Sequence, residues 1–218
     1  MVFELSKVEH PHVREAMVGH LRNIDGDLAK RVAGGIGMAA LPAAPKAAQP
    51  VQDLPRSPAL QIIGKMKATL EGRVVAILVA DGSDGGIVAA LKKASMAAGA
   101  SVKIVAPKVG GVTLEDGSLL SADGQLAGTP SVLFDAVAVV LSAKGAKAMC
   151  AEAAAVDFVR DAFGHLKAIA ADAGGSALLQ HAAIKADAGV VKANDVKAFI
   201  AAAKVRHWDR EASVRTLA

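Results

Sequence analysis

The stretch RVVAILVADGSDGG, residues 73–86, decides the fold class of this chain. After Arg73 it runs through seven apolar residues without a polar interruption. A continuous apolar run of this length is typical of a strand that is buried on both faces of a parallel sheet. The glycine-rich run 81–86 then predicts a turn. We therefore expect a buried strand over 73–80 that leads through this turn into a helix over 87–98.

The same alternation of apolar runs and helical patterns continues to about residue 204. Further strands are expected at 101–106, 136–141, 166–171 and 189–191. Further helices are expected at 151–163, 175–183 and 194–203, the last capped by Asn194. Residues 112–126 predict a small hairpin with its turn at Asp116-Gly117. Strands separated by helices predict an α/β fold with a doubly wound parallel sheet and right-handed crossovers.

Composition supports this fold class and excludes several classes of partner. Hydrophobic residues make up 53% of the chain and aromatic residues only 3%, with no tyrosine, so the core must consist of small and branched aliphatic side chains. The net charge of +4 is mild, and the basic residues are scattered, which argues against nucleic-acid binding. No apolar run reaches 18 residues, so no membrane span is expected.

Cysteine usage and the first residues bear on the compartment. The single cysteine, Cys150, allows no disulfide within the chain and no cysteine-based metal site. The start, residues 1–7, lacks the apolar core and cleavage site of a signal peptide. We therefore expect a cytoplasmic protein.

The first 38 residues predict a helical segment. After Pro11, apolar residues recur at steps of three and four and form one stripe: Val13, Met17, Leu21, Ile24, Leu28 and Val32. The pair Gly34-Gly35 ends the pattern. One helix cannot bury such a stripe alone, so we expect it to pack either on the rest of this chain or on a partner. If the stripe stays exposed, self-association is expected.

A linker and a tail complete the predicted organisation. Residues 39–59 hold five of the eight prolines, which favours an extended, semi-rigid spacer: Pro42, Pro45, Pro50, Pro55 and Pro58. Residues 60–205 form the α/β domain. Residues 206–218 form a charged tail that either docks or frays. The predicted order is thus a helical segment over 1–38, a linker, a domain and a tail.

Two turns should lie at the carboxyl ends of the strands, where ligands bind in such sheets. The glycine spacing of Asp81–Gly86 matches no phosphate-binding motif, and its two aspartates would repel an anion. We interpret it as a tight turn capped by Asp84. The second turn, 170–176, is a small-residue strand-to-helix corner of the kind that carries a nucleophile elbow.

At this second corner the position of the nucleophile holds Asp172, followed by Gly174 and Gly175. A carboxylate acts as nucleophile in haloacid and phosphoryl chemistry, which also requires a base, a metal or a lysine nearby. Alternatively, Asp172 caps the following helix by accepting hydrogen bonds from its first-turn N–H groups. The sequence leaves both alternatives open.

The remaining polar candidates favour structural roles. Ser83 and Ser176 are small turn residues, and we expect Cys150 to open a helix as a small buried apolar residue. Histidines near helix ends commonly satisfy terminal carbonyls, as we expect for His165 and His181. No metal site is expected at the histidines of the first segment or at the tail pair: His10, His12, His20, and His207 with Trp208.

Residues 3–33, FELSKVEHPHVREAMVGHLRNIDGDLAKRVA, resemble the closing helical segment of the haem catalase core. The remainder resembles the extra C-terminal domain of large-subunit catalases, which a proline-rich linker also joins to the core. The resemblance covers nearly the whole chain. That domain is similar in fold to the class I glutamine amidotransferase-like superfamily, a flavodoxin-like group that includes proteases and glyoxalase-type proteins.

This resemblance implies a degenerate site. Active relatives carry a cysteine in a motif of the form A-[IV]-C-[AH]-G, and the matching residues here are Ala170-Ala171-Asp172-Ala173-Gly174. The glutamate that contacts this cysteine in many relatives falls near Ile87. The resemblance therefore implies no amidotransferase, protease or glyoxalase activity.

Catalases hold their haem iron through a tyrosinate, and their distal histidine and asparagine come from the core domain. The chain contains no tyrosine. The resemblance thus implies that haem belongs to the parent enzyme and that this chain has no cofactor.

Three hypotheses of function follow. In the first, the chain is a non-catalytic part of a catalase, an enzyme that disproportionates hydrogen peroxide, and stabilises the core domain and the homotetramer. In the second, it is a chaperone-like module for unfolded client proteins. In the third, it is a residual hydrolase that uses Asp172.

Overall fold

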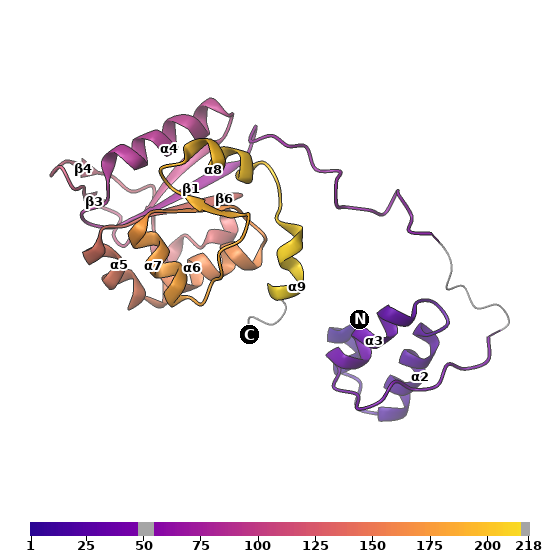
Figure 1. The fold of residues 1–218 in the computed structure, drawn as a ribbon. Helices are drawn as coiled ribbons and strands as arrows, with labels where there is room; N and C mark the ends of the chain where they lie inside the picture. Colours follow the sequence, from indigo (N-terminus) through magenta and orange to yellow (C-terminus); the bar gives the residue numbers. More distant parts are fainter. Residues whose placement is uncertain (48–54, 215–218) are drawn as a thin grey trace. The chain divides into compact units, whose positions relative to one another are not determined.

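The computed structural model describes residues 1–47 and 55–214, which divide into two compact units, 1–61 and 62–218 (Figure 1). Residues 48–54 of the predicted linker and 215–218 of the predicted tail lie outside the described residues. The four-part division of the chain stays a prediction. Among the residues described, no helix is both long and apolar enough to cross a membrane.

The second unit is built on a six-stranded sheet with strand order β5-β2-β1-β6-β7-β8. Every pair in this sheet is parallel, for example Val75 opposite Ala136 in the β1–β6 pair. The strands are β1 Val74–Val79, β2 Ser101–Ala106, β5 Gly124–Gln125, β6 Ala136–Val140, β7 Ile169–Ala171 and β8 Val190–Lys192. The α/β fold and parallel sheet predicted from the sequence are confirmed, and the architecture is consistent with a flavodoxin-like domain.

Helices cover both faces of this sheet (Figure 1). On one face lie α4 (Gly85–Ala97) and α8 (Val196–Ala203), whose buried residues share a core cluster with Val75, Ile77 and Val79 of β1. On the other face lie α5 (Ala143–Cys150), α6 (Ala153–Gly164) and α7 (Ala173–His181). The predicted doubly wound arrangement is therefore confirmed.

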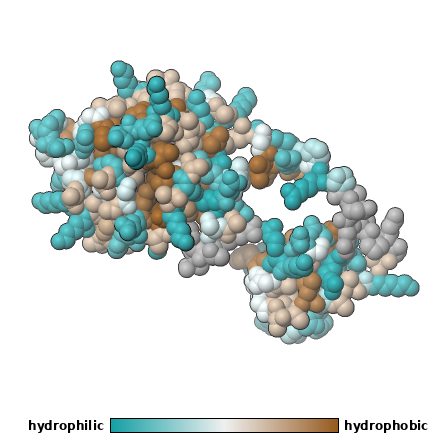
Figure 2. All heavy atoms as spheres, viewed as in Figure 1, coloured by the Kyte–Doolittle hydropathy of each residue, from teal (hydrophilic) through white to brown (hydrophobic). Residues whose placement is uncertain are grey.

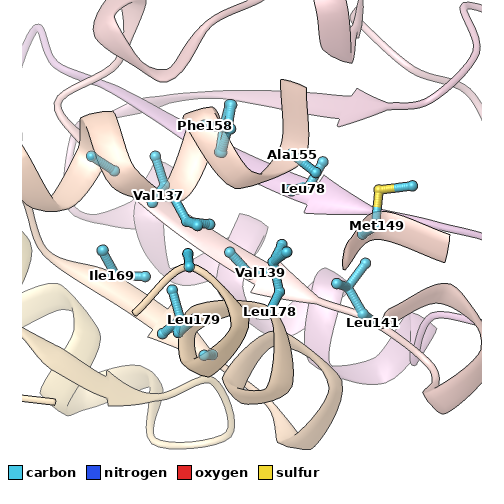
Figure 3. Close-up of a cluster of buried hydrophobic side chains, with 14 of the residues drawn as sticks. Leu78, Val137, Val139, Leu141, Met149, Ala155, Phe158, Ile169, Leu178 and Leu179 are labelled. Carbon is cyan, nitrogen blue, oxygen red and sulfur yellow. The ribbon is translucent and has the colours of Figure 1, made fainter. Parts of the chain in front are cut away.

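The core beneath α5, α6 and α7 shows why a composition without tyrosine suffices (Figure 3). Val137 and Val139 of β6 point into this cluster, which also holds Met149, Phe158 and Leu178 from the three helices. The alternate residues of β6 face the opposite cluster, as the two-residue period of a strand requires. All residues of β6 are buried, so the strand reads as a continuous apolar run.

Three local predictions need correction. The helix expected over 151–163 is α6, which begins two residues later, and the sequence missed α5 before it, which Ser142 caps by accepting from the Gly145 N–H at 3.0 Å. The last large helix is capped by Asp195, which accepts from Ala198, and not by Asn194. The strand expected from residue 166 begins at Ile169, since Leu166 has a φ of 60° and lies in a turn.

The predicted hairpin is confirmed. It consists of β3 (Val112–Thr113) paired antiparallel with β4 (Leu119–Leu120), and Gly117 turns with a φ of 84°. Backbone and side-chain bonds tie this hairpin to the β1–α4 turn. The Asp81 carboxylate accepts from the Thr113 N–H at 2.9 Å, and the Glu115 N–H donates to the Ser83 carbonyl at 3.0 Å.

The first unit contains three helices where one continuous helix was expected: α1 Val2–Ser6, α2 Pro11–Leu21 and α3 Gly26–Gly35. The break between α2 and α3 arises because the Asp25 carboxylate caps a new helix, accepting from the N–H groups of Asp27 and Leu28 at 2.8 and 2.9 Å. The earlier break precedes Pro11, the first residue of α2.

The break between α2 and α3 also divides the predicted apolar stripe. Leu21 and Val32 are buried in the unit's own core. Val13 and Met17, each 41% exposed, and Ile24, 58% exposed, instead face outward. Part of the stripe therefore packs within the chain, which is one of the two alternatives that the sequence left open, and part of it stays exposed.

The described part of the charged tail, residues 206–214, docks on the α/β unit. Arg206 donates to the Asp135 carbonyl at 2.9 Å, and the His207 N–H donates to the Leu166 carbonyl. Arg210, in the short helix η3 (Trp208–Arg210), is only 4% exposed and grips the Asp187 carboxylate at 2.6 and 2.7 Å. The final described helix, α9 (Glu211–Val214), follows directly. These contacts make residues 206–214 part of the α/β unit.

Because of Lys167, we expect the stability of the fold to depend on pH in the alkaline range. Its side chain is buried and donates to the Ser131 carbonyl at 2.7 Å. Burial, and then the nearby Arg206 charge, lower the pKa of Lys167 to about 8, while Asp135 and Asp161 act in the opposite direction. Between pH 8 and 10.5 the unfolded chain binds more protons at this lysine than the folded protein, so stability rises with pH there.

We expect Lys167→Met to abolish that rise. The measurement is the urea unfolding free energy of wild type and variant across this pH range, with Lys185→Met, which replaces an exposed lysine, as the matched control. The control should keep the rise. Equal slopes for wild type and Lys167→Met would contradict the assignment.

Candidate functional site

A hollow of about 750 Å³ lies at the carboxyl edge of the sheet. Its polar lining comes from separate elements: Asp84 before α4, Glu115 of the hairpin, Ser142 before α5, Asp172 and Ser176 at the start of α7, Lys192 at the end of β8, and Asn194 after β8. This is the edge at which ligands bind in open parallel sheets. The structure thus brings both predicted turns together in one hollow.

Asp172 acts as a helix cap at this site. One carboxylate oxygen, Oδ1, accepts from the Gly175 N–H at 2.7 Å in the first turn of α7. The other, Oδ2, accepts from the Leu141 N–H at 2.9 Å, at the end of the neighbouring β6. The carboxylate therefore joins two separate segments, and the capping interpretation is confirmed.

The backbone at Asp172 lacks the geometry of a nucleophile elbow. An elbow is a sharp, strained turn that exposes its nucleophile. Asp172 has φ −82° and ψ −167°, which is extended backbone. Among the residues described, the only non-glycine residues with positive φ are Leu166 and Ala183, and both lie elsewhere. The chain passes through this corner without strain at the position of the nucleophile.

Gly174 and Gly175 allow α7 to begin close against β6. A Cβ at Gly174 would clash with the Leu141 carbonyl oxygen, and one at Gly175 would clash with the Val139 carbonyl oxygen. The two glycines are needed for this close backbone approach. They shape the corner together with the bonds of Asp172.

Burial raises the pKa of Asp172 above its usual value of 3.8. The hydrogen bonds from Gly175 and Leu141 lower it, and the negative charge of Asp84 raises it further. Just above pH 3.8 the folded state therefore holds a proton that the unfolded chain has released. The contribution of this carboxyl to stability is largest below pH 3.8 and is lost as the pH rises through the folded pKa.

We expect Asp172→Asn, which does not titrate, to remove this loss. The stability difference, wild type minus variant, should fall as the pH rises above 3.8 and level off once the carboxyl of the folded protein has ionised. Urea unfolding at a series of pH values measures it. A difference that grows with pH over this range would show that the pKa is lowered instead.

The other predicted turn residues have structural roles. Asp84 caps α4 by accepting from the Ile87 N–H at 3.0 Å, as predicted. Ser83 is fully buried, and its hydroxyl lies 2.6 Å from the Val140 carbonyl oxygen, to which it donates. Ser176 donates to the Asp172 carbonyl. Ile87 lines the same hollow as Asp172.

Sequence reasoning missed Glu115 and Lys192. Glu115 reaches the hollow because hydrogen bonds join the hairpin to the β1–α4 turn, and Lys192 reaches it because of the position of β8. Neither contact can be recognised from the residues next to Glu115 or Lys192 in the sequence. The one available hint was that β8 also ends at the carboxyl edge, where side chains of all parallel strands meet.

Cys150 differs from its prediction. It closes α5 instead of opening a helix, and it is half-buried. It lines a second hollow of about 410 Å³ between α5 and α7, together with Leu141, Ala146 and Ala177.

The histidines occupy helix ends and the docked tail. His165 follows α6 and His181 ends α7, as predicted. The Nε2 atom of His207 lies 3.2 Å from the Ala202 carbonyl oxygen, and burial lowers the pKa of this imidazole. Within the described ranges, no group of three or more His, Cys, Asp or Glu side chains is arranged to hold a metal ion.

Comparison with known proteins gives two family matches. Residues 71–212 match the C-terminal domain found in long catalases, and residues 1–36 match a family described as catalase-related immune-responsive.

Several curated proteins are similar to nearly the whole chain. Catalase C of Rhizobium meliloti is 42% identical over 222 residues, which cover 99% of this chain and 32% of that protein. Catalase HPII of Pseudomonas aeruginosa is 38% identical over 99% of this chain and 31% of its own length. Catalase-B of Dictyostelium discoideum is 31% identical over 97% and 32%. The chain thus spans about a third of the length of these relatives.

Proposed function

The chain belongs to the long catalases, whose C-terminal domain it carries over residues 71–212, and we propose that this domain stabilises a catalase and its tetramer without taking part in catalysis. The parent reaction would be the disproportionation of hydrogen peroxide, carried out by a catalase core domain. The partners in this proposal are that core domain and further copies of the same enzyme, in the cytoplasm.

The observation that carries the proposal is the use of Asp172. Both of its oxygens accept backbone hydrogen bonds that hold α7 against β6. A nucleophilic carboxylate needs an oxygen directed at a substrate and a base, metal or lysine in contact with the reacting group. The hydrogen bonds of Asp172 instead close a corner of the sheet, which is a structural task.

The residues of the chain do not fit haem. Catalases hold the iron through a tyrosinate, and the chain contains no tyrosine. Its half-buried tail histidine, His207, is already placed against the Ala202 carbonyl. We therefore propose no cofactor role for this chain.

Exposed apolar side chains of the first unit supply a contact for the core domain. Val13, Met17 and Ile24 all lie on its surface, although its own core holds Val18 and Leu21. Figure 2 shows hydrophobic residues among hydrophilic ones on the surface of this unit. Burying these side chains in the assembled enzyme would contribute about 25 cal/mol for each Å² of apolar surface removed from water. That contribution is available only in the complex, so it stabilises the assembly.

The test compares a long catalase with and without the domain that corresponds to residues 60–218. We expect the shortened enzyme to melt at a lower temperature by differential scanning calorimetry and to populate fewer tetramers by sedimentation velocity. An unchanged melting temperature together with an unchanged tetramer population would refute the stabilising role.

The second candidate is a chaperone-like module, which the same exposed apolar residues support. Light scattering of a heat-labile client protein, with and without an equimolar amount of the chain, tests it. Residues 60–218 alone are the control. Suppression by both would assign holdase activity to the α/β unit, and suppression only by the full chain would assign it to the first unit.

A further inference from the structure

The two hollows at the carboxyl edge are parts of one cleft. Both are lined by Leu141, Ala143 and Ala173, which lie where α5 and α7 begin. These two helices lie side by side in Figure 1. We call the larger hollow the mouth and the smaller one the trough.

The mouth and the trough differ in chemistry. The mouth carries the carboxylates of Asp84, Glu115 and Asp172 against one ammonium group, Lys192. Burial and then the charge of Asp84 raise the pKa of Asp172, which is consistent with an excess of negative charge. The trough is lined mainly by small apolar residues, with Lys147 as its one charged lining residue. The cleft therefore suits an apolar segment that ends in a basic residue.

The chain itself contains such a segment. In LQIIGKMK, residues 60–67, Leu60 is 83% exposed, Ile62 73% and Met66 39%. The segment forms neither helix nor strand, and it ends in Lys67. Large apolar side chains held this far out in water gain free energy when a partner covers them.

The segment cannot place Lys67 in the mouth of its own chain. The Lys67 carbonyl accepts from Arg73 Nη2 at 2.9 Å, and Arg73 directly precedes β1. Lys67 is thereby held at the amino edge of the sheet. The mouth lies at the carboxyl edge, roughly 20 Å away along the six residues of β1. A lysine side chain does not span that distance.

We propose that the segment 60–67 of one copy lies in the cleft of a second copy, with its apolar side chains in the trough and Lys67 at the acidic mouth. A twofold arrangement allows each copy to donate its segment to the other. This contact goes beyond the proposed role in catalase stability, because it needs no core domain.

The single native cysteine provides a direct test by cross-linking. Cys150 lines the trough, so Ile62→Cys should form a disulfide with Cys150 of a second copy under mild oxidation. Intact mass and peptide mapping should show a covalent dimer joined between positions 62 and 150. Ile62→Cys combined with Cys150→Ala should lose that product. A 62–150 disulfide within one chain, or no such disulfide, would overturn the proposal.

Sedimentation equilibrium measures the same contact without cross-linking. Ala177→Phe fills the trough at an exposed position, and Ile62→Asp places a charge on the segment. Each should weaken dimerisation by at least about tenfold. The matched controls are Ala90→Phe on exposed α4 and Leu119→Asp, at a site 83% exposed, and both should leave dimerisation unchanged. A monomer at all concentrations would refute the proposal. A dimer whose affinity is unchanged by Ala177→Phe and by Ile62→Asp but is lost in Met17→Asp would also refute the proposal.

Discussion

Replacing Gly175 with alanine is expected to destabilise the α/β unit by roughly 3 kcal/mol. The added methyl group would clash with the carbonyl oxygen of Val139 and would lie in tight contact with its carbonyl carbon and Cβ. Val139 lies in β6, which pairs with β1 on one side and β7 on the other, so its backbone cannot retreat. The helix must instead move away, which breaks the cap bonds of Asp172. Urea unfolding followed by circular dichroism measures the loss.

The matched control is Gly164→Ala. This glycine is the last residue of α6, and no atom would lie within 4 Å of its added methyl group. Alanine in a helix is favoured over glycine by up to about 1 kcal/mol, so this variant should be neutral or slightly more stable. Equal losses in the two variants would show that crowding against β6 is not the cause.

Replacing Arg210 with methionine is expected to cost about 3 kcal/mol. The guanidinium donates to both oxygens of Asp187 and to the carbonyls of Phe163 and Lys167, and it stacks 4.0 Å from the Phe163 ring centroid. Methionine keeps much of the apolar packing but leaves these acceptors without their donor. We expect residues 206–214 to detach at lower urea concentration than the rest of the domain.

The same variant should change the response to acid. Burial alone would raise the pKa of Asp187, but the hydrogen bonds from Arg210 and the Gly189 N–H outweigh it and hold this pKa below 3.8. Asp187 therefore contributes stability above pH 3.8, and this is lost as the pH falls through the lower folded pKa. In Arg210→Met, the unfolding free energy should therefore fall less on acidification than it does in the wild type. Lys197→Met, at an exposed site on α8, should stay within about 0.5 kcal/mol of wild type.

Much of the fold was predictable because its signals are local. The central strands β1 and β6 are fully or almost fully buried, so their sequences are unbroken apolar runs. Asp172 directly follows β7, Asp84 ends the turn after β1, and each immediately precedes a helix, which is enough to assign both as caps. The sequence also located the corner that carries Asp172, Gly174 and Gly175.

The remaining features depend on contacts between distant residues. Arg210 meets partners 23 to 47 residues earlier in the chain, so a charged tail gave no sign that it would be buried. Glu115 enters the site only because the hairpin bonds to the β1–α4 turn. In the first unit, the periodic stripe concealed the break at Asp25, where a capping aspartate outweighs the continuity of the apolar pattern.

The most direct test of the account is the urea unfolding free energy of Asp172→Ala at pH 7. The account holds that this carboxylate closes the corner between β6 and α7 and performs no chemistry. Alanine removes the cap of α7 and leaves the Leu141 N–H without its acceptor, so stability should fall by about 2 kcal/mol. An unchanged unfolding free energy would contradict the structural role and return Asp172 to consideration as a reactive group.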